Sequence, residues 1–161
     1  MDFRGSAFWL IVYILFLSFC DKSSETSDVV CPRNTYLADK TCYMYNTNND
    51  FNWQQADDIC YGRGMKLMKV RSWNQFLIFQ TWTDKTGYRF WIGAKLHSGS
   101  FHWLDGSSYF QPYWVPGEPN NLRNEHCVMF WKTDHGTGLN NEDCGSKLGF
   151  ICEAEGKVSF S

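Results

Sequence analysis

The run Phe90-Trp91-Ile92-Gly93-Ala94 marks the point at which the sequence changes from helical to strand-like patterns. Downstream of it, further short apolar pieces alternate with loops rich in Gly and Asn, which is typical of strands separated by turns. These pieces are residues 101–104, 126–130 and 149–152. Upstream of it, apolar residues recur at helical spacing. The order predicts an α+β domain in which two helices precede an antiparallel sheet.

Two capping patterns predict where the helices begin. Asn52 is followed three residues later by Gln55, and Ser72 is followed in the same way by Gln75. Each pair can exchange reciprocal hydrogen bonds at a helix N-terminus. The residues expected to end the two helices are Gly62, Gly64 and Gly87. The aromatic residues of the second helix are predicted to be core rather than binding residues, and they are Phe76, Phe79 and Trp82.

The stretch from Asp105 to about Asn124 has no strand or helix pattern and is long for a domain of this size. Long ordered loops tend to carry function, because the surrounding scaffold positions their side chains. Three tryptophans, Trp91, Trp103 and Trp114, are expected to pack beneath this loop rather than to stack on a ligand. The loop is therefore the predicted place of a binding site.

The composition argues against several classes of protein. Apolar residues make up 43% of the chain and aromatic residues 18%, which is enough for a packed core and unlike a disordered or collagen-like chain. The formal charge of −2 lacks the basic face that a nucleic-acid binder needs. The sequence has neither a Gly-X-Ser-X-Gly nor a His-Glu-X-X-His motif. We therefore expect neither a nucleic-acid partner nor enzyme activity.

The seven cysteines are an odd number, and the N-terminus offers an explanation. Residues 7–19 form an apolar run that is shorter than the roughly 20 residues of a membrane span and fits a signal-peptide core. Cleavage after Cys20 would leave six cysteines in a secreted chain without a membrane span. A short membrane anchor is the alternative interpretation of the run. Residues 21–30 are then predicted to be a flexible leader, residues 31–153 the domain and residues 154–161 a short tail.

Several motifs taken together resemble the long form of the C-type lectin-like domain, over residues 31–153. They are the six remaining cysteines, Trp91-Ile92-Gly93-Ala94, Trp103-Leu104-Asp105-Gly106, and Trp114-Val115-Pro116-Gly117-Glu118-Pro119-Asn120. The resemblance implies two helices, antiparallel sheets and a long calcium- and sugar-binding loop. It also implies the disulfides Cys31–Cys42, Cys60–Cys152 and Cys127–Cys144, although the residues alone leave 15 connectivities open.

The resemblance further implies a calcium ion in the long loop. Its expected ligands are Glu118, Asn120, Glu125, Asn140 and Asn141, and the first four would also bind the sugar. Carboxylate and amide oxygens are the ligands that calcium prefers. Pro119 is expected to be cis, which would turn both of its neighbours toward the ion. In sugar-binding members the order Glu-Pro-Asn goes with mannose-type sugars, including N-acetylglucosamine, fucose and glucose.

Asn141 departs from the family pattern, in which an aspartate stands at this place. The exchange removes one charge from a site whose calcium affinity depends on ligand charge. Glu142 and Asp143 follow directly and would supply a carboxylate if the loop shifted register. His126 replaces another family aspartate and is expected to be a partly exposed strand residue.

Two hypotheses follow from the sequence. The first is a secreted, calcium-dependent lectin for mannose-type glycans, acting in innate defence or cell-surface recognition. The second is a calcium-independent lectin-like domain that binds a protein or another non-sugar ligand through a degenerate ion site.

Overall fold

The structure is a computed structural model that describes residues 28–108 and 113–159. The predicted signal peptide, residues 1–20, lies outside the described residues, and so does most of the predicted leader. Among the helices of the described part, none has the length and apolar character that crossing a membrane requires.

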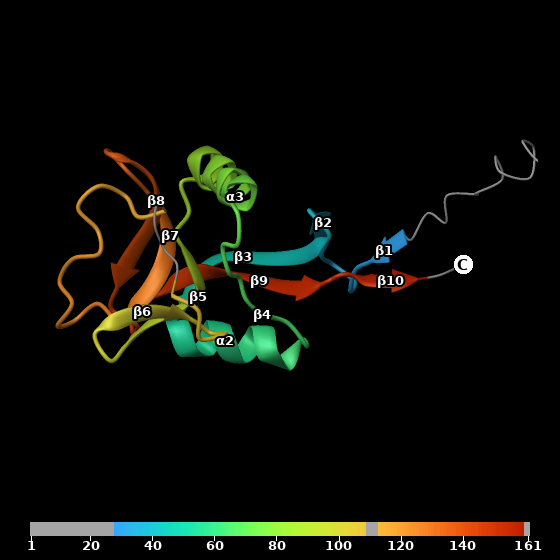
Figure 1. The fold of residues 1–161 in the computed structure, drawn as a ribbon, viewed down its shortest axis with the longest axis horizontal. Coiled ribbons are helices and arrows are strands. Elements are labelled where there is room, and N and C mark those ends of the chain that lie inside the picture. The colour runs from blue at the N-terminus through green and yellow to red at the C-terminus, as the bar shows by residue number, and fades with distance from the viewer. Residues whose placement is uncertain (1–27, 109–112, 160–161) are drawn as a thin grey trace, which may run out of the picture. The chain divides into compact units, whose positions relative to one another are not determined.

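An eight-stranded mixed sheet forms the framework of the domain (Figure 1). Its strands are β2 Tyr36–Ala38, β3 Thr41–Phe51, β4 Lys66–Leu67, β5 Phe90–His97, β6 Ser100–Trp103, β7 Cys127–Thr133, β8 Gly136–Glu142 and β9 Leu148–Glu155. The main path runs β2-β3-β9-β5-β7-β8, while β4 pairs with β9 and β6 pairs with β5. All pairs are antiparallel except β5 and β9, which place Phe90 opposite Gly149 in a parallel register. Apolar runs predict strands but not their direction, so this pair corrects the expectation of a purely antiparallel sheet.

The longest strands that the sequence-based prediction lacks are β3 and β8. Both are rich in Asn, which is depleted in strands. Pairing overrides this local preference: β3 pairs with β9 from Thr41 opposite Glu155 to Asn46 opposite Phe150. The strand β8 pairs with β7 along its whole length. The predicted order of helices before sheet is therefore corrected, because a long strand precedes both helices.

Short strands lie within the predicted leader and within the predicted tail. Asp28–Val30 forms strand β1, although residues 21–30 are predicted to be a flexible leader. It pairs with β10, Lys157–Ser159, which falls within the predicted tail 154–161. The two valines of β1 favour extended backbone, a preference that the polar composition of the leader conceals.

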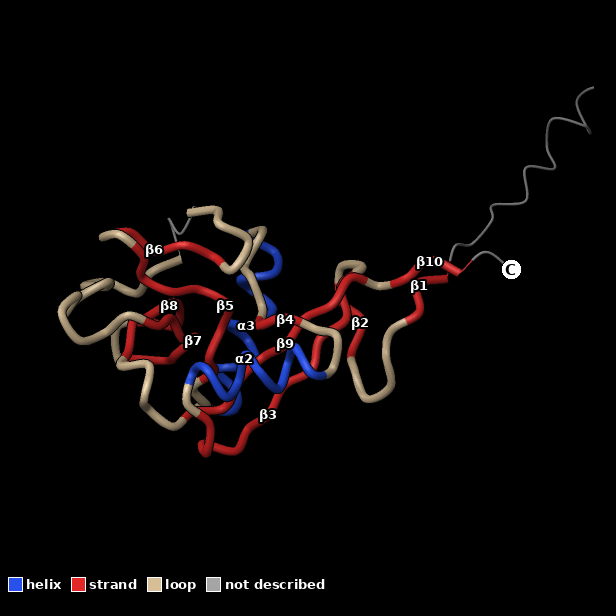
Figure 2. Tube along the Cα trace, turned by 90° about the horizontal axis from the view of Figure 1, so that it is seen from below, coloured by secondary structure: helices blue, strands red, loops and turns tan. Residues whose placement is uncertain are grey.

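The two helices, α2 Trp53–Gly62 and α3 Trp73–Thr86, begin at the predicted caps. Asn52 and Gln55 form the complete capping box at α2. At α3, Ser72 accepts a hydrogen bond from the Gln75 N–H, but the Gln75 side chain accepts from Arg71 N–H instead of returning to the cap. The helices lie on opposite sides of β3 and β9 (Figure 1), and α2 lies in front of these strands when seen from below (Figure 2).

Each helix covers one of two hydrophobic clusters. The α3 cluster includes Phe76 and Phe79, which confirms that these aromatic residues are core. The α2 cluster includes Trp53 and Trp91. Between them, Gly93 of β5 passes so close to β4 that an added Cβ would lie 2.5 Å from the Leu67 carbonyl oxygen. The glycine of the opening sequence motif is therefore required by packing.

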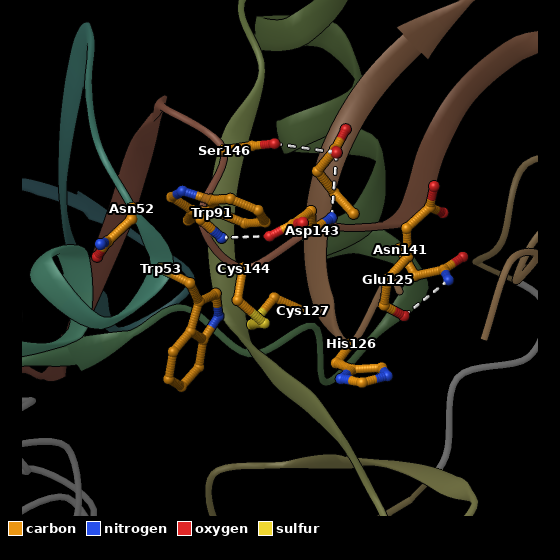
Figure 3. Close-up of a disulfide and its surroundings, with 12 residues drawn as sticks. Asn52, Trp53, Trp91, Glu125, His126, Cys127, Asn141, Asp143, Cys144 and Ser146 are labelled. Atoms are coloured by element: carbon orange, nitrogen blue, oxygen red, sulfur yellow. Dashed lines mark hydrogen bonds between the residues drawn. A yellow bond between two sulfur atoms is a disulfide. The ribbon is translucent and has the colours of Figure 1, made fainter. Parts of the chain in front are cut away.

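Three disulfides confirm the pairings that the family resemblance implies. They are Cys31–Cys42, Cys60–Cys152 and Cys127–Cys144. The second joins α2 to β9 across 92 residues of sequence. The third joins the start of β7 to the turn after β8 (Figure 3). This last bridge lies next to the strands that carry the predicted site.

Candidate functional site

The long loop between β6 and β7 is fastened to β8. Val115 N–H donates to the Leu139 carbonyl at 3.1 Å, and Leu139 N–H donates to the Tyr113 carbonyl at 2.8 Å. Gly138 lies beneath this crossing, where an added Cβ would approach the Tyr113 carbonyl oxygen to 2.6 Å. The pairing with β8 therefore fixes the position of residues 113–115, from which the remainder of the loop continues.

The three tryptophans near the loop are packing residues. Trp91 and Trp103 are buried, as predicted. Trp114 is half-buried and packs edge-on against the Phe101 ring, with the ring centroids 5.1 Å apart. These contacts form the floor of the loop.

Glu118 and Asn120 lie side by side after the loop's fastening point. The Glu118–Pro119 peptide is cis, as the resemblance implies. The Asn120 side-chain Nδ2 donates to Glu118 Oε1 at 2.6 Å, and the Asn120 N–H lies 3.1 Å from Oε2. Burial raises the pKa of Glu118, and the nearby Glu125 and Glu142 add to this, while the Asn120 hydrogen bonds oppose it. An acceptor and a donor therefore stand together at this point of the loop.

Glu125 is positioned by Asn121, a residue that is not among those predicted for the site. Asn121 donates from Nδ2 to Glu125 Oε1 at 2.9 Å, and its carbonyl accepts from the Glu125 N–H at 3.1 Å. Asn121 adopts a left-handed backbone conformation with φ 41°, which Asn tolerates better than most residues. The sequence signal for this role was a second Asn directly after the Glu-Pro-Asn motif.

Asn141 connects the two halves of the loop to β8. Its side chain is completely buried. Oδ1 accepts from the Asn120 N–H at 2.9 Å, while Nδ2 donates to the Asn120 carbonyl at 2.5 Å and to the Glu125 carbonyl at 3.0 Å (Figure 3 shows the bond to Glu125). The neighbouring Asn140, also buried, donates from Nδ2 to the Asn141 carbonyl at 2.6 Å. All five residues predicted for the site are thus joined in one hydrogen-bonded group.

Glu142 and Asp143 have other partners. Glu142 Oε1 accepts from the Asp143 N–H at 3.1 Å and from Ser146 Oγ at 3.0 Å. Asp143 Oδ1 accepts from the Gly145 N–H at 2.7 Å. These bonds stabilise the turn that contains Cys144 (Figure 3). Asp143 is therefore engaged in the turn, and Glu142 reaches the site through its electrostatic effect on Glu118.

His126 lies just before β7 and is half-buried. Its ring Nε2 is 3.2 Å from the Leu122 carbonyl. It is partly exposed, as expected, but it precedes the strand rather than belonging to it.

The donor set fits a calcium ion only in part. Calcium takes six to eight oxygen ligands. Glu118, Asn120, Glu125 and Asn140 carry side-chain oxygens of that kind. Asn141 does not fit, because its oxygen already accepts from Asn120 N–H and its nitrogen, which cannot ligate calcium, faces two carbonyls. Within residues 28–108 and 113–159, no group of three or more His, Cys, Asp or Glu side chains is placed to hold a metal ion.

Comparisons with known protein sequences agree on one kind of domain. A family model described as the lectin C-type domain matches residues 49–154. C-type lectin domain family 4 member M of Symphalangus syndactylus is 30% identical over 128 residues, which are 76% of this chain and 29% of that protein. CD209 antigen-like protein C of Mus musculus is also 30% identical over 128 residues, covering 76% of this chain and 68% of the relative. The chain thus spans less than a third of the length of the first relative.

Solved structures share the fold. The C-type lectin domain of murine dendritic cell inhibitory receptor 2, in complex with N-glycan, is 24% identical, covers 78% of this chain and 99% of its own, and has a TM-score of 0.68. The cow C-type carbohydrate-recognition domain of CD23, in the presence of a GlcNAc2Man3 oligosaccharide, is 26% identical, covers 83% and 100%, and has a TM-score of 0.67. The calcium-independent C-type lectin SPL-2 from Saxidomus purpuratus is 21% identical, covers 78% and 94%, and has a TM-score of 0.70.

Proposed function

Because the chain belongs to the C-type lectin domain family, we propose that it binds carbohydrate through its long loop, with a preference for mannose-type sugars. The binding residues are Glu118, Asn120, Glu125 and Asn140. Family and fold are those of lectins rather than of enzymes, so binding rather than catalysis is the expected activity. The two solved domains studied with an N-glycan or an oligosaccharide support a glycan ligand.

The observation that carries this proposal is the contact between Asn120 and Glu118. Their side chains present a carboxylate acceptor and an amide donor 2.6 Å apart. Glu118 is half-buried and Asn120 is exposed. A sugar hydroxyl both donates and accepts hydrogen bonds, so two neighbouring hydroxyls match such a pair. Glu118-Pro119-Asn120 is also the order that resembles mannose-type members. Charge-assisted hydrogen bonds to Glu118 would be the strongest contacts.

Calcium dependence is the part of the sequence-based hypothesis that the geometry supports least. A calcium ion bound here would add positive charge and coordinate sugar hydroxyls directly. An ion on the side that faces the Asn120 and Glu125 carbonyls would meet the Asn141 nitrogen. Asn141 would become its ligand only by turning its amide and releasing both carbonyls at a fully buried position. Leaving buried carbonyls without donors costs about 1 to 3 kcal/mol each. Direct hydrogen bonding of sugar by the other four residues is therefore the favoured mode.

We also propose that the protein is secreted. Three disulfides lie within the domain, and disulfides persist in oxidising, extracellular environments. A secreted glycan-binding domain would act in recognition of cell-surface or microbial glycans, as in innate defence.

Retention on immobilised mannose tests the proposed function. We expect the full chain to be retained and to be eluted by free methyl mannoside but not by free galactose. Glu118→Gln should weaken retention, because the charged acceptor is lost. Asp134→Asn, which removes a charge from an exposed turn, is the matched control and should bind normally. Absence of retention in both calcium and chelator would overturn the proposal and favour a non-sugar ligand.

A further inference from the structure

We propose that the Asn141 amide closes the binding loop in place of a cation, so that the geometry of the loop and its sugar binding are independent of calcium. The inference deepens the proposed function and rests on it for its sugar-binding readout only. Its second readout, the protection of a backbone amide, needs no ligand.

The orientation of the Asn141 amide follows from its partners. The Asn120 N–H can only donate, so the atom that faces it at 2.9 Å is the side-chain oxygen. The carbonyls of Asn120 and Glu125 can only accept, so the atom between them is the side-chain nitrogen. If the amide were flipped, its nitrogen would face the Asn120 N–H and its oxygen would face the carbonyls of Asn120 and Glu125. The hydrogen-bond pattern therefore has one solution.

A carboxylate at the same place would behave differently. It would keep the acceptor for the Asn120 N–H but would turn a second oxygen toward the carbonyls of Asn120 and Glu125. The position is 0% exposed, so that second oxygen would be buried without a donor, which is costly unless a cation lies between it and the carbonyls. Asp at position 141 thus needs an ion to close the loop, whereas Asn supplies two N–H donors itself.

The bonds from Asn141 hold both ends of residues 120–125, the part of the long loop that lies among the proposed sugar-binding residues. Asn120 lies at its first end and Glu125 at its second, and both are held to the same buried side chain of β8. Glu118 is in turn bonded to Asn120. Closing the loop therefore fixes the residues of the proposed sugar site without a contribution from a metal. The nearby carboxylates of Glu118, Glu125 and Glu142 allow a cation to approach, but closure does not depend on it.

Hydrogen exchange of the Asn120 amide, followed by NMR in chelator and in 10 mM calcium, tests the inference directly. We expect the wild-type amide to be equally protected in both conditions, because its acceptors, Asn141 Oδ1 and Glu118 Oε2, both belong to the protein. In Asn141→Asp, protection should be low in chelator and restored by calcium, since 10 mM is about ten- to a hundredfold above the dissociation constants of extracellular calcium modules. Asn49→Asp, an exposed site on β3, is the matched control and should behave as wild type.

Sugar affinity provides the second readout. Wild type should bind mannose equally in chelator and in calcium, whereas Asn141→Asp should lose about tenfold or more in chelator and recover with calcium. Wild-type protection that appears only with calcium would overturn the inference, even if Asn141→Asp does not fold. Calcium-independent protection in a protein that binds no sugar would support loop closure by the amide and reject the proposed function, so the two failures are distinguishable.

Discussion

Gly138 and the carbonyl oxygen of Tyr113 lie so close that a Cβ on Gly138 would come within 2.6 Å of that oxygen. The same Cβ would meet Val115 Cγ1 at 3.2 Å. This contact fixes the distance between β8 and the start of the proposed sugar-binding loop. Because β8 also carries Asn140 and Asn141, the glycine aligns both parts of the candidate site.

Replacing this glycine should disturb the loop. In Gly138→Ala the 113–115 segment must move away from β8, because backbone atoms rather than a flexible side chain are in the way. We expect a loss of stability of about 1 to 3 kcal/mol and a fall in mannose affinity of about tenfold, measured by urea unfolding and titration. Gly62→Ala is the control, since an added Cβ there meets nothing within 4 Å. Normal mannose binding by Gly138→Ala would show that the loop is not positioned by β8.

Exchanging the donor and the acceptor of the candidate site should change sugar preference. The double variant Glu118→Gln with Asn120→Asp keeps one amide and one carboxylate but reverses their order, giving the Gln-Pro-Asp pattern that resembles galactose-type members. We expect the ratio of galactose to mannose affinity to rise about tenfold or more, measured by competition on an immobilised glycan. An unchanged ratio would mean that Glu118 and Asn120 do not contact the sugar.

Arg71 and Glu153 form an ion pair in which only one partner is deeply buried. The guanidinium donates two hydrogen bonds, of 2.6 and 2.5 Å, to the Glu153 carboxylate. Glu153 is 4% exposed, whereas the Arg71 side chain is 45% exposed. Arg71→Met would leave the carboxylate buried without its partner. We expect a loss of about 2 to 3 kcal/mol, somewhat below the usual cost of breaking a fully buried pair.

The double variant Arg71→Met with Glu153→Met is the critical comparison. It removes the buried charge together with its partner, and such exchanges for apolar residues are often neutral. We therefore expect urea unfolding to show the double variant to be more stable than Arg71→Met alone. A double variant that is no more stable than Arg71→Met would mean that the pair does not interact in the way that its geometry indicates.

Features of the fold that depend on neighbouring residues could be predicted from the sequence. The cap at Asn52 needs only Gln55 three residues away, and the end of α3 needs only the left-handed conformation that Gly87 adopts. The disulfides and the cis peptide before Pro119 came from the family resemblance. The strand β8 could not be predicted, because its asparagines oppose strand formation locally and its pairing with β7 overrides them.

The hydrogen bonds of Asn141 could not be predicted from the sequence either. Its partners lie 21 and 16 residues away along the chain, and all of their contacting atoms belong to the backbone, so no side-chain pattern indicates them. From the sequence, the replacement of the family aspartate by Asn141 indicated only that the calcium site had lost one ligand charge and would bind calcium more weakly. Burial and the three hydrogen bonds give a different interpretation of the same substitution, in which the amide replaces the ion.

The turn that starts the long loop should make stability depend on pH. Lys69 Nζ lies 2.5 Å from Asp105 Oδ2, and the Ser107 hydroxyl and N–H donate to Oδ1 at 2.8 and 3.1 Å. These bonds hold the pKa of Asp105 well below its usual range. A carboxyl group whose pKa is lower in the folded than in the unfolded protein adds stability above the unfolded pKa, near 4, and loses that contribution as the pH falls toward the folded pKa.

Asp105→Asn should therefore be less stable than wild type at pH 7, and the difference should shrink by pH 3. The Asp105 side chain is 50% exposed, so solvent screening limits the loss at pH 7 to about 0.5 to 1 kcal/mol. Thermal unfolding of both proteins across this pH range measures the difference, with Asp134→Asn as a charge control on an exposed turn. A difference that stays constant from pH 7 to pH 3 would show that the lost contribution is packing of the turn rather than the charge of Asp105.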